Sequence, residues 1–263
     1  MDYSHYRCIK TERVDKVLVV TWNRPEALNA VNGDLHREMS TIFADIAGDQ
    51  EAQAIVLTGA GRAFCAGGDI KWMEDLQNPG GLDSTIREGR KIIVDMLEVE
   101  QPIIAAVNGP AVGLGATIAL FRDVIFAADT AKIADPHVRV GIVAGDGGAV
   151  IWPWLVGVAR AKEYLMTGDP VTAQEAERIG LINHVVPADQ LHAKALEFAT
   201  RLANGPSKAI RWTKVSVNKI LRDTVNSVLD TSMALEGHTF HTADHQEAKK
   251  AFVEKRAPKF TGK

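Results

Sequence analysis

The chain has 263 residues, enough for one large domain or two, and its composition (46% hydrophobic, 24% charged, 6% aromatic) is that of an ordinary globular protein. A net charge of −3 argues against a nucleic-acid-binding face, although a local basic pocket for an anionic ligand remains compatible with it. Two cysteines make no disulfide framework, and the N-terminus lacks the apolar core of a signal peptide. We therefore expect a cytoplasmic protein without a membrane anchor.

Strand and helix patterns alternate along the first two-thirds of the chain, and helices alone follow. The expected strands cover residues 6–12 and 16–22 (a hairpin), 54–58, 103–107, 124–128 and 182–187. Helices are expected at residues 34–47, 83–100 and 188–203, and a further helix is expected to start near Gly113. The region 147–180 should hold helices interrupted at Pro153, Gly157, Gly168 and Pro170, and the region 207–255 should hold two or three more. This order predicts α/β layers and a helical tail.

Residues 102–121 contain no charged side chain, and such a run would ordinarily suggest a transmembrane helix. The Asn108-Gly109-Pro110 turn and two further glycines argue against that, because proline and glycine interrupt a regular helix. We expect a buried strand, a tight turn and a buried helix, whose first N–H groups point at whatever lies beside them.

Two glycine-rich loops follow buried strands, at residues 59–69 and 108–115. Neither fits a dinucleotide fingerprint, because Phe64 and Ile118 stand where the third glycine would be, and no P-loop Gly-Lys-Ser/Thr follows. Either the glycines only permit tight turns, or their N–H groups approach a ligand and form an oxyanion hole.

Five segments together resemble the enoyl-CoA hydratase/isomerase (crotonase) superfamily over nearly the whole chain. They are NRPEALNA at 23–30, AFCAGGDI at 63–70, PIIAAVNGPAVGLG at 102–115, TGDPVTAQEAERIGLINHVVP at 167–187 and FVEKRAPKF at 252–260. The resemblance implies an α/β crotonase fold of repeated ββα units in a spiral core over residues 1–200, and a C-terminal helical trimerisation region over 201–263. It also implies a homotrimer, or a hexamer built as a dimer of trimers.

The same resemblance implies an acyl-CoA thioester substrate, with coenzyme A as part of the substrate and no permanently bound cofactor. The thioester oxygen would lie between the backbone N–H groups of Gly68 and Leu114, which would stabilise an enolate; Leu114 replaces the commoner glycine but keeps the N–H. Coenzyme A would lie along Arg24, Ala27, Leu28, Ala66, Asp69 and Ile70, with Phe252 and Lys255 reaching the coenzyme A of a neighbouring subunit. Phe64, Trp72, Met73 and residues 74–90 are expected to shape the acyl pocket.

The chain departs from the hydratase pattern at both catalytic glutamates, where Thr117 and His137 stand instead. The imidazole of His137 suits general acid or base work at neutral pH, and Asp146 can orient it or move protons itself. Isomerase members of the family place an acid one position before Asp146. As structural alternatives, Asp146 would cap the helix that follows it and His137 would be a buried, hydrogen-bonded histidine.

Enoyl-CoA hydration or dehydration is the leading expectation for the reaction, because it is the commonest outcome in the family. Two alternatives stay open: hydrolysis of a C–C bond in a β-diketone or β-keto thioester (retro-Claisen) by the His137/Asp146 pair, and acyl-CoA binding without catalysis. His238, His241 and His245 have a spacing that permits a metal site, but no second ligand pair is near them, and we expect no metal.

Overall fold

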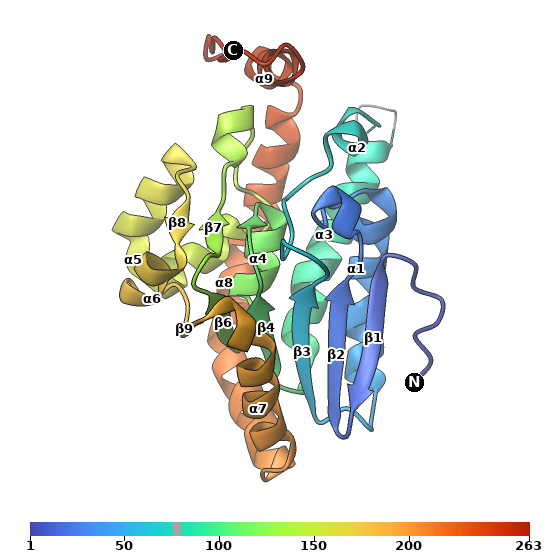
Figure 1. Cartoon of the computed structure of the whole chain (residues 1–263). Helices are drawn as coiled ribbons and strands as arrows, with labels where there is room; N and C mark the ends of the chain where they lie inside the picture. The colour runs from blue at the N-terminus through green and yellow to red at the C-terminus, as the bar shows by residue number, and fades with distance from the viewer. Residues whose placement is uncertain (76–79) are drawn as a thin grey trace.

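The computed structural model describes residues 1–75 and 80–263, which form two β-sheets with helices packed around them (Figure 1). The larger sheet has the order β1-β2-β3-β4-β6-β9, and the smaller has the order β5-β7-β8. The strands are β1 (Ile9–Val14), β2 (Val17–Trp22), β3 (Ala54–Gly59), β4 (Ile103–Val107), β5 (Ala111–Val112), β6 (Val124–Ala128), β7 (Lys132–Ala134), β8 (Val171–Thr172) and β9 (His184–Val186).

The helices cover both faces of the larger sheet, with α7 on one face and α1 and α3 on the other (Figure 1). The α-helices are α1 (Gly33–Gly48), α2 (Ile70–Asp75), α3 (Gly81–Glu98), α4 (Leu114–Leu120), α5 (Gly148–Thr167), α6 (Ala173–Arg178), α7 (Leu191–Ala203), α8 (Ser207–Thr239) and α9 (Ala243–Val253). Short 3-10 helices are η1 (Pro25–Ala27), η2 (His137–Val140) and η3 (Ala188–Gln190). The described residues contain no helix that is both apolar enough and long enough to cross a membrane.

Most of the elements predicted from residue patterns are present. The β1–β2 hairpin is antiparallel, and β2, β3, β4 and β6 then pair in parallel. The apolar residues of α1 lie on one buried face, as their spacing predicted. Two helices, α8 and α9, occupy the region predicted to hold two or three helices. The first strand begins later than predicted, because the N–H groups of Arg7 and Cys8 donate to the carboxylate of Glu38 on α1.

The uncharged stretch 102–121 folds as predicted, as strand β4, a turn and helix α4. Every residue of β4 and α4 is buried, which explains why neither element carries a polar face. The two-residue strand β5 lies between them and pairs with β7 in the smaller sheet. That sheet was not predicted, because strands of two or three residues are too short for a periodic pattern.

The helix at 148–167 was predicted to be interrupted at Pro153, and that prediction was wrong. Pro153 lies within α5, and the backbone leaves helical geometry only at Gly157, with φ +78°. Pro153 is the sixth residue of the helix, beyond the first turn, so it has no N–H to donate to the carbonyl of Ala149 and the helix continues with one hydrogen bond fewer.

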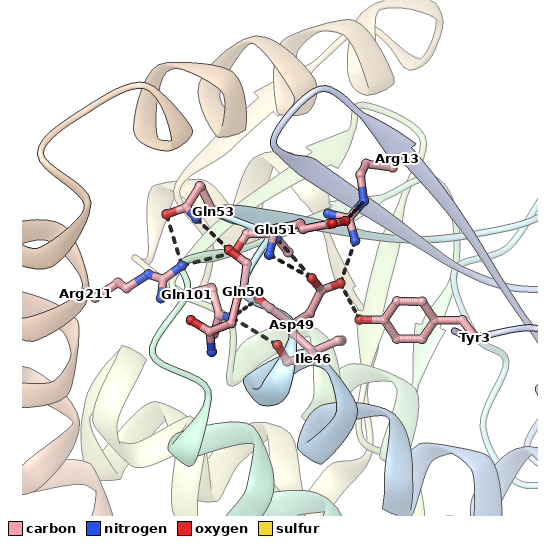
Figure 2. Close-up of polar contacts among 10 residues, drawn as sticks. Tyr3, Arg13, Ile46, Asp49, Gln50, Glu51, Gln53, Gln101 and Arg211 are labelled. Atoms are coloured by element: carbon pink, nitrogen blue, oxygen red, sulfur yellow. Dashed lines mark hydrogen bonds and ion pairs between the residues drawn. The ribbon is translucent and has the colours of Figure 1, made fainter. Parts of the chain in front are cut away.

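A buried polar network joins the N-terminal segment to the helices that flank the sheet (Figure 2). Asp49, which follows α1, accepts hydrogen bonds from the Tyr3 hydroxyl (2.9 Å) and the Arg13 guanidinium (2.6 Å). The amide of Gln101 donates to the carbonyl oxygens of Ile46 and Asp49, at 3.0 Å each. Because Asp49 is buried, these bonds replace water around its charge, and the network fixes the end of α1 against β1 and β4.

Candidate active site

Three loops meet at the edge of the larger sheet where β2, β3 and β4 end. The loops after β3 and β4 run side by side: the N–H of Cys65 donates to the Pro110 carbonyl (3.0 Å), and the N–H of Val112 donates to the Cys65 carbonyl (2.9 Å). The side chain of Asn29 joins the loop after β2 to them by donating to the carbonyls of Ala60 and Ala63. The carboxyl ends of parallel strands thus bring together loops that lie far apart in sequence.

The two amides predicted to form the oxyanion hole, those of Gly68 and Leu114, both belong to residues that line one cavity. The glycines before them nearly touch: a Cβ on Gly113 would lie 3.9 Å from the Cα of Gly67. Gly113 has φ +54°, a conformation that favours glycine, and it caps α4 so that Leu114 presents the first N–H of the helix. Neither N–H donates a hydrogen bond to another residue within 1–75 or 80–263.

His137 lies against this loop, since a Cβ on Gly113 would be 3.4 Å from its Cε1. Its Nδ1 forms a very short hydrogen bond with Asp135. Its Nε2 faces the cavity, 3.4 Å from a carboxylate oxygen of Asp146 and 3.9 Å from one of Glu236. A buried acid at Nδ1 with Nε2 directed at the cavity is the arrangement that orients histidine for proton transfer.

The three groups at the cavity have shifted pKa values. Burial alone would lower the pKa of His137, but the carboxylates of Asp135 and Asp146 outweigh it and raise that pKa well above 6.5. Burial and the charge of Asp146 raise the pKa of Glu236 to about 8. Burial opposes ionisation of Asp146, yet His137 and hydrogen bonds from Thr117 and Gly148 hold its pKa below 3.8. At neutral pH the cluster thus contains an imidazolium, an ionised Asp146 and a protonated Glu236.

Asp146 is held by two hydrogen-bond donors from different helices. The Thr117 hydroxyl on α4 donates to Asp146 at 3.1 Å, and the Gly148 N–H at the start of α5 is a second donor. The predicted location at a helix N-terminus is therefore confirmed, although the N-cap residue itself is Gly147. Thr117, which stands where a hydratase glutamate was expected, contacts the cluster through this hydroxyl.

Sequence reasoning missed two members of the cluster, Asp135 and Glu236. Asp135 was not singled out in the sequence, although an acid two residues before a candidate catalytic histidine is a usable signal. Glu236 lies on α8, about a hundred residues further along, and a single glutamate on a long helix has no pattern that separates it from a solvated charge. It reaches the cavity because α8 packs on α3, where Gly237 leaves room for Ile86.

The cavity has a volume of about 390 Å³, and its wall beyond the acidic cluster is mainly apolar. Trp72 and Met73 line it as predicted, as do parts of α3, whereas Phe64 is fully buried in the core instead. Within the predicted stretch 74–90, residues 76–79 lie outside the described part of the chain. The apolar wall residues include Trp72, Met73, Leu82, Ile86, Val140, Ile142, Met233 and Phe240.

The residues predicted to contact coenzyme A are partly brought together. The N–H of Ala66 donates to the Leu28 carbonyl (3.1 Å), and Arg24 pairs with Asp69 (3.3 Å), so the two predicted loops lie side by side. Ala27 belongs to η1 in the same loop, and Ile70 begins α2. On the other side, Phe252 on α9 is 60% exposed and lines its own chain's cavity, while Lys255 is exposed just beyond α9. Their role at a neighbouring subunit stays a prediction.

Asp135, His137 and Asp146 have ligand atoms within 4.8 Å of one another, which raises the question of a metal site. The two carboxylates contact opposite nitrogens of one imidazole ring, so the ring separates them and Nδ1 is occupied by Asp135. That geometry fits proton transfer better than metal binding, in which lone pairs must converge on one point. His245 is buried, and its Nδ1 donates to the Val140 carbonyl at 2.7 Å.

Comparison with known proteins places this chain in a family. Residues 12–263 match the family model described as enoyl-CoA hydratase/isomerase. A protein of Mycobacterium bovis named probable enoyl-CoA hydratase echA8 is 38% identical over 97% of this chain and 98% of its own. The crystal structure of an enoyl-CoA hydratase/isomerase from Mycobacterium paratuberculosis matches with a TM-score of 0.90 and 39% identity, covering 92% of this chain and 97% of that one.

A further solved structure is similar to this chain, with a different activity in its name. It is a β-diketone hydrolase from the cyanobacterium Anabaena sp. PCC 7120, bound to (S)-3-oxocyclohexyl acetic acid. The TM-score is 0.85 and the identity 34%, with 90% of this chain and 96% of that chain covered. The fold is accordingly the crotonase fold, and the chain belongs to the enoyl-CoA hydratase/isomerase family of enzymes.

Proposed function

We propose that this enzyme hydrolyses a C–C bond between two carbonyl groups, in a β-diketone or a β-keto thioester. The observation that supports this best is the carboxylate–imidazole cluster: His137, oriented by Asp135 and facing Asp146, stands where the family's hydration chemistry would need glutamates. An imidazole held in this way activates water for attack on a carbonyl carbon. The hydratase reaction instead uses two carboxylates at one double bond, and Thr117 provides none.

The reaction balances without a further reactant. One carbonyl oxygen of the substrate accepts hydrogen bonds from the N–H groups of Gly68 and Leu114. Water adds to the other carbonyl carbon while Nε2 of His137 takes a proton from it. The bond between that carbon and the central carbon then breaks, and its electron pair becomes an enolate whose oxygen the two amides stabilise. A proton goes to the enolate carbon, and the products are a carboxylic acid and a ketone or thioester.

The protonation states assign a proton donor as well as a base. Glu236, with a pKa of about 8, is protonated at neutral pH and is able to give a proton to the enolate carbon. His137 has to lose its proton before it can accept one from water, and Asp146 stabilises the imidazolium that forms again. Asp135 does not line the cavity and acts as a positioning residue.

A second candidate function is hydration of an enoyl-CoA, and specific observations favour it too. The relative at 38% identity is named a probable enoyl-CoA hydratase, and the Arg24–Asp69 and Leu28–Ala66 contacts hold the loops that resemble the family's coenzyme A site. In that reaction the amides of Gly68 and Leu114 would stabilise a thioester enolate, and the His137 cluster would supply both proton transfers.

One substrate panel separates the two reactions. Wild-type enzyme is incubated in H₂¹⁸O with cyclic β-diketones, β-ketoacyl-CoAs, crotonyl-CoA, and longer and branched enoyl-CoAs, and products are identified by mass spectrometry. We expect cleavage of at least one 1,3-dicarbonyl compound with ¹⁸O in the new carboxylate, abolished in His137→Ala and strongly reduced in Asp146→Asn. His192→Ala, on the exposed face of α7, is the matched control. Turnover of enoyl-CoAs alone would favour hydration, and no turnover of any compound would favour a binding protein.

We also propose that the chain assembles as a homotrimer or a dimer of trimers through its C-terminal helices. In the single chain, α8 exposes large apolar side chains, including Trp212 (57%), Val217 (64%) and Ile220 (58%). Such a face is unusual on a monomer and indicates a protein contact. Light scattering after gel filtration measures the mass, and a monomer at micromolar concentration would contradict the proposal.

A further inference from the structure

A second histidine, His36 on α1, lies in the wall of the same cavity and takes no part in the reaction described above. The residue is only 3% exposed. A buried polar group in a mainly apolar wall costs free energy unless it finds a partner, so the orientation of its two nitrogens is informative.

One nitrogen of His36 is already satisfied. Nδ1 lies 2.8 Å from a carboxylate oxygen of Glu88 on α3, and this hydrogen bond, the largest influence, lowers the pKa of Glu88. The ionised carboxylate accepts, so Nδ1 carries the hydrogen. The ring also packs against Trp72, with 5.1 Å between ring centroids. These two contacts fix the ring and leave Nε2 as its free end.

Nε2 of His36 makes no hydrogen bond to any residue in 1–75 or 80–263. Residue 89 beside it is glycine, so no side chain from that position covers Nε2: a Cβ there would lie 3.9 Å from Nε2 and would collide with Cε of Met233, at 2.9 Å. Gly89 and Met233 both line the cavity. A ligand in the cavity can therefore come close to Nε2, among side chains that are otherwise apolar on that side.

We propose that His36 recognises a neutral oxygen, a ketone or a hydroxyl group, on the part of the substrate remote from the bond that breaks. This inference rests on the proposed function for the placement of the reacting carbonyl at Gly68 and Leu114. A purely apolar substrate would leave Nε2 buried without a partner, whereas a hydroxyl donates to it and a ketone accepts from its protonated form. A carboxylate at this position is disfavoured by the negative charge of Glu88 behind the ring.

Binding of ligands that cannot be cleaved tests the inference independently of catalysis. Calorimetry compares two matched pairs that differ by one hydroxyl group remote from the carbonyl, octanoyl-CoA with 7-hydroxyoctanoyl-CoA, and cyclohexyl methyl ketone with its 4-hydroxy derivative. For wild type we expect the oxygenated member of a pair to bind about tenfold more tightly, the effect of one net hydrogen bond. His36→Leu should remove that preference, His36→Gln should keep part of it, and His192→Leu should leave it unchanged.

The outcomes separate this inference from the proposed function. If a 1,3-dicarbonyl compound is cleaved but His36→Leu keeps the wild-type ratio of affinities, the role of His36 is refuted and the reaction stands. If no compound is cleaved, but wild type binds the oxygenated ligand more tightly and His36→Leu loses this preference, the recognition role of His36 is supported and the proposed reaction is not. Equal binding within both pairs by wild type, or no binding of either pair, overturns the inference.

Discussion

The role of Asp135 leads to the sharpest test of the cluster, the substitution Asp135→Asn. Asparagine has the same shape, so the change removes the negative charge at Nδ1 of His137 with little change in packing. One oxygen of Asp135, Oδ2, is buried and accepts no hydrogen bond from any described residue, and it lies against Gly148. An asparagine that kept its oxygen toward Nδ1 would bury its NH₂ group at this position without an acceptor.

The magnitude follows from these contacts. A buried NH₂ group without an acceptor costs about 1–3 kcal/mol, so the amide of the asparagine turns its nitrogen toward Nδ1 of His137. Nδ1 then accepts a hydrogen bond, and the ring hydrogen moves to Nε2. In that tautomer Nε2 cannot take a proton from water. Loss of the charge-assisted hydrogen bond between residue 135 and His137 removes about 1.5–3 kcal/mol of stabilisation from the imidazolium. Together these effects should lower kcat by about 10³-fold, or roughly 4 kcal/mol in the activation barrier.

The assay is kcat and KM for the best substrate of the panel, with thermal unfolding as a check on folding. Asp129→Asn, an exposed aspartate after β6, is the matched control and should leave kcat unchanged. Because Asp135 acts through His137, adding Asp135→Asn to His137→Ala should cost little more. Nitrogen-15 NMR of the histidines should show the altered tautomer. A loss below threefold, or equal losses with and without His137, would refute the reasoning.

Three further predictions concern pH, the support of Asp146 and the loops. The reactive form of the enzyme needs neutral His137 and protonated Glu236. Because the pKa of His137 is raised well above 6.5 and that of Glu236 to about 8, kcat/KM should peak on the alkaline side of neutrality. A rising limb of the pH profile centred at or below pH 6.5 would contradict this. Thr117→Val removes one donor to Asp146 and should lower kcat about tenfold while the unfolding temperature changes little. Asn29→Ala removes two hydrogen bonds that join the loops after β2 and β3 and a third within the loop after β2, so chemical denaturation should show a loss of about 3 kcal/mol in the free energy of unfolding. A loss under about 1 kcal/mol would mean that other contacts hold these loops.

Local patterns predicted the elements well where the pattern was long enough to be periodic. The apolar face of α1, the buried run of β4 and the glycine turn before α4 each follow from the spacing of neighbouring residues. The same reasoning failed for the β5-β7-β8 sheet, whose strands of two or three residues carry no periodicity, and for Pro153, whose place inside α5 depends on where that helix begins.

The sequence by itself determined the family and the two glycine-rich loops, because contiguous motifs carry these features; that Thr117 and His137 replace acids stays a prediction. Only the tertiary structure decided which acids surround His137. Asp135 occupies Nδ1 and Asp146 shares Nε2 with Glu236, a residue that reaches the cavity only because α8 packs on α3. The pKa values of the cluster depend on burial and on charges a few ångströms apart, and those are properties of the folded chain.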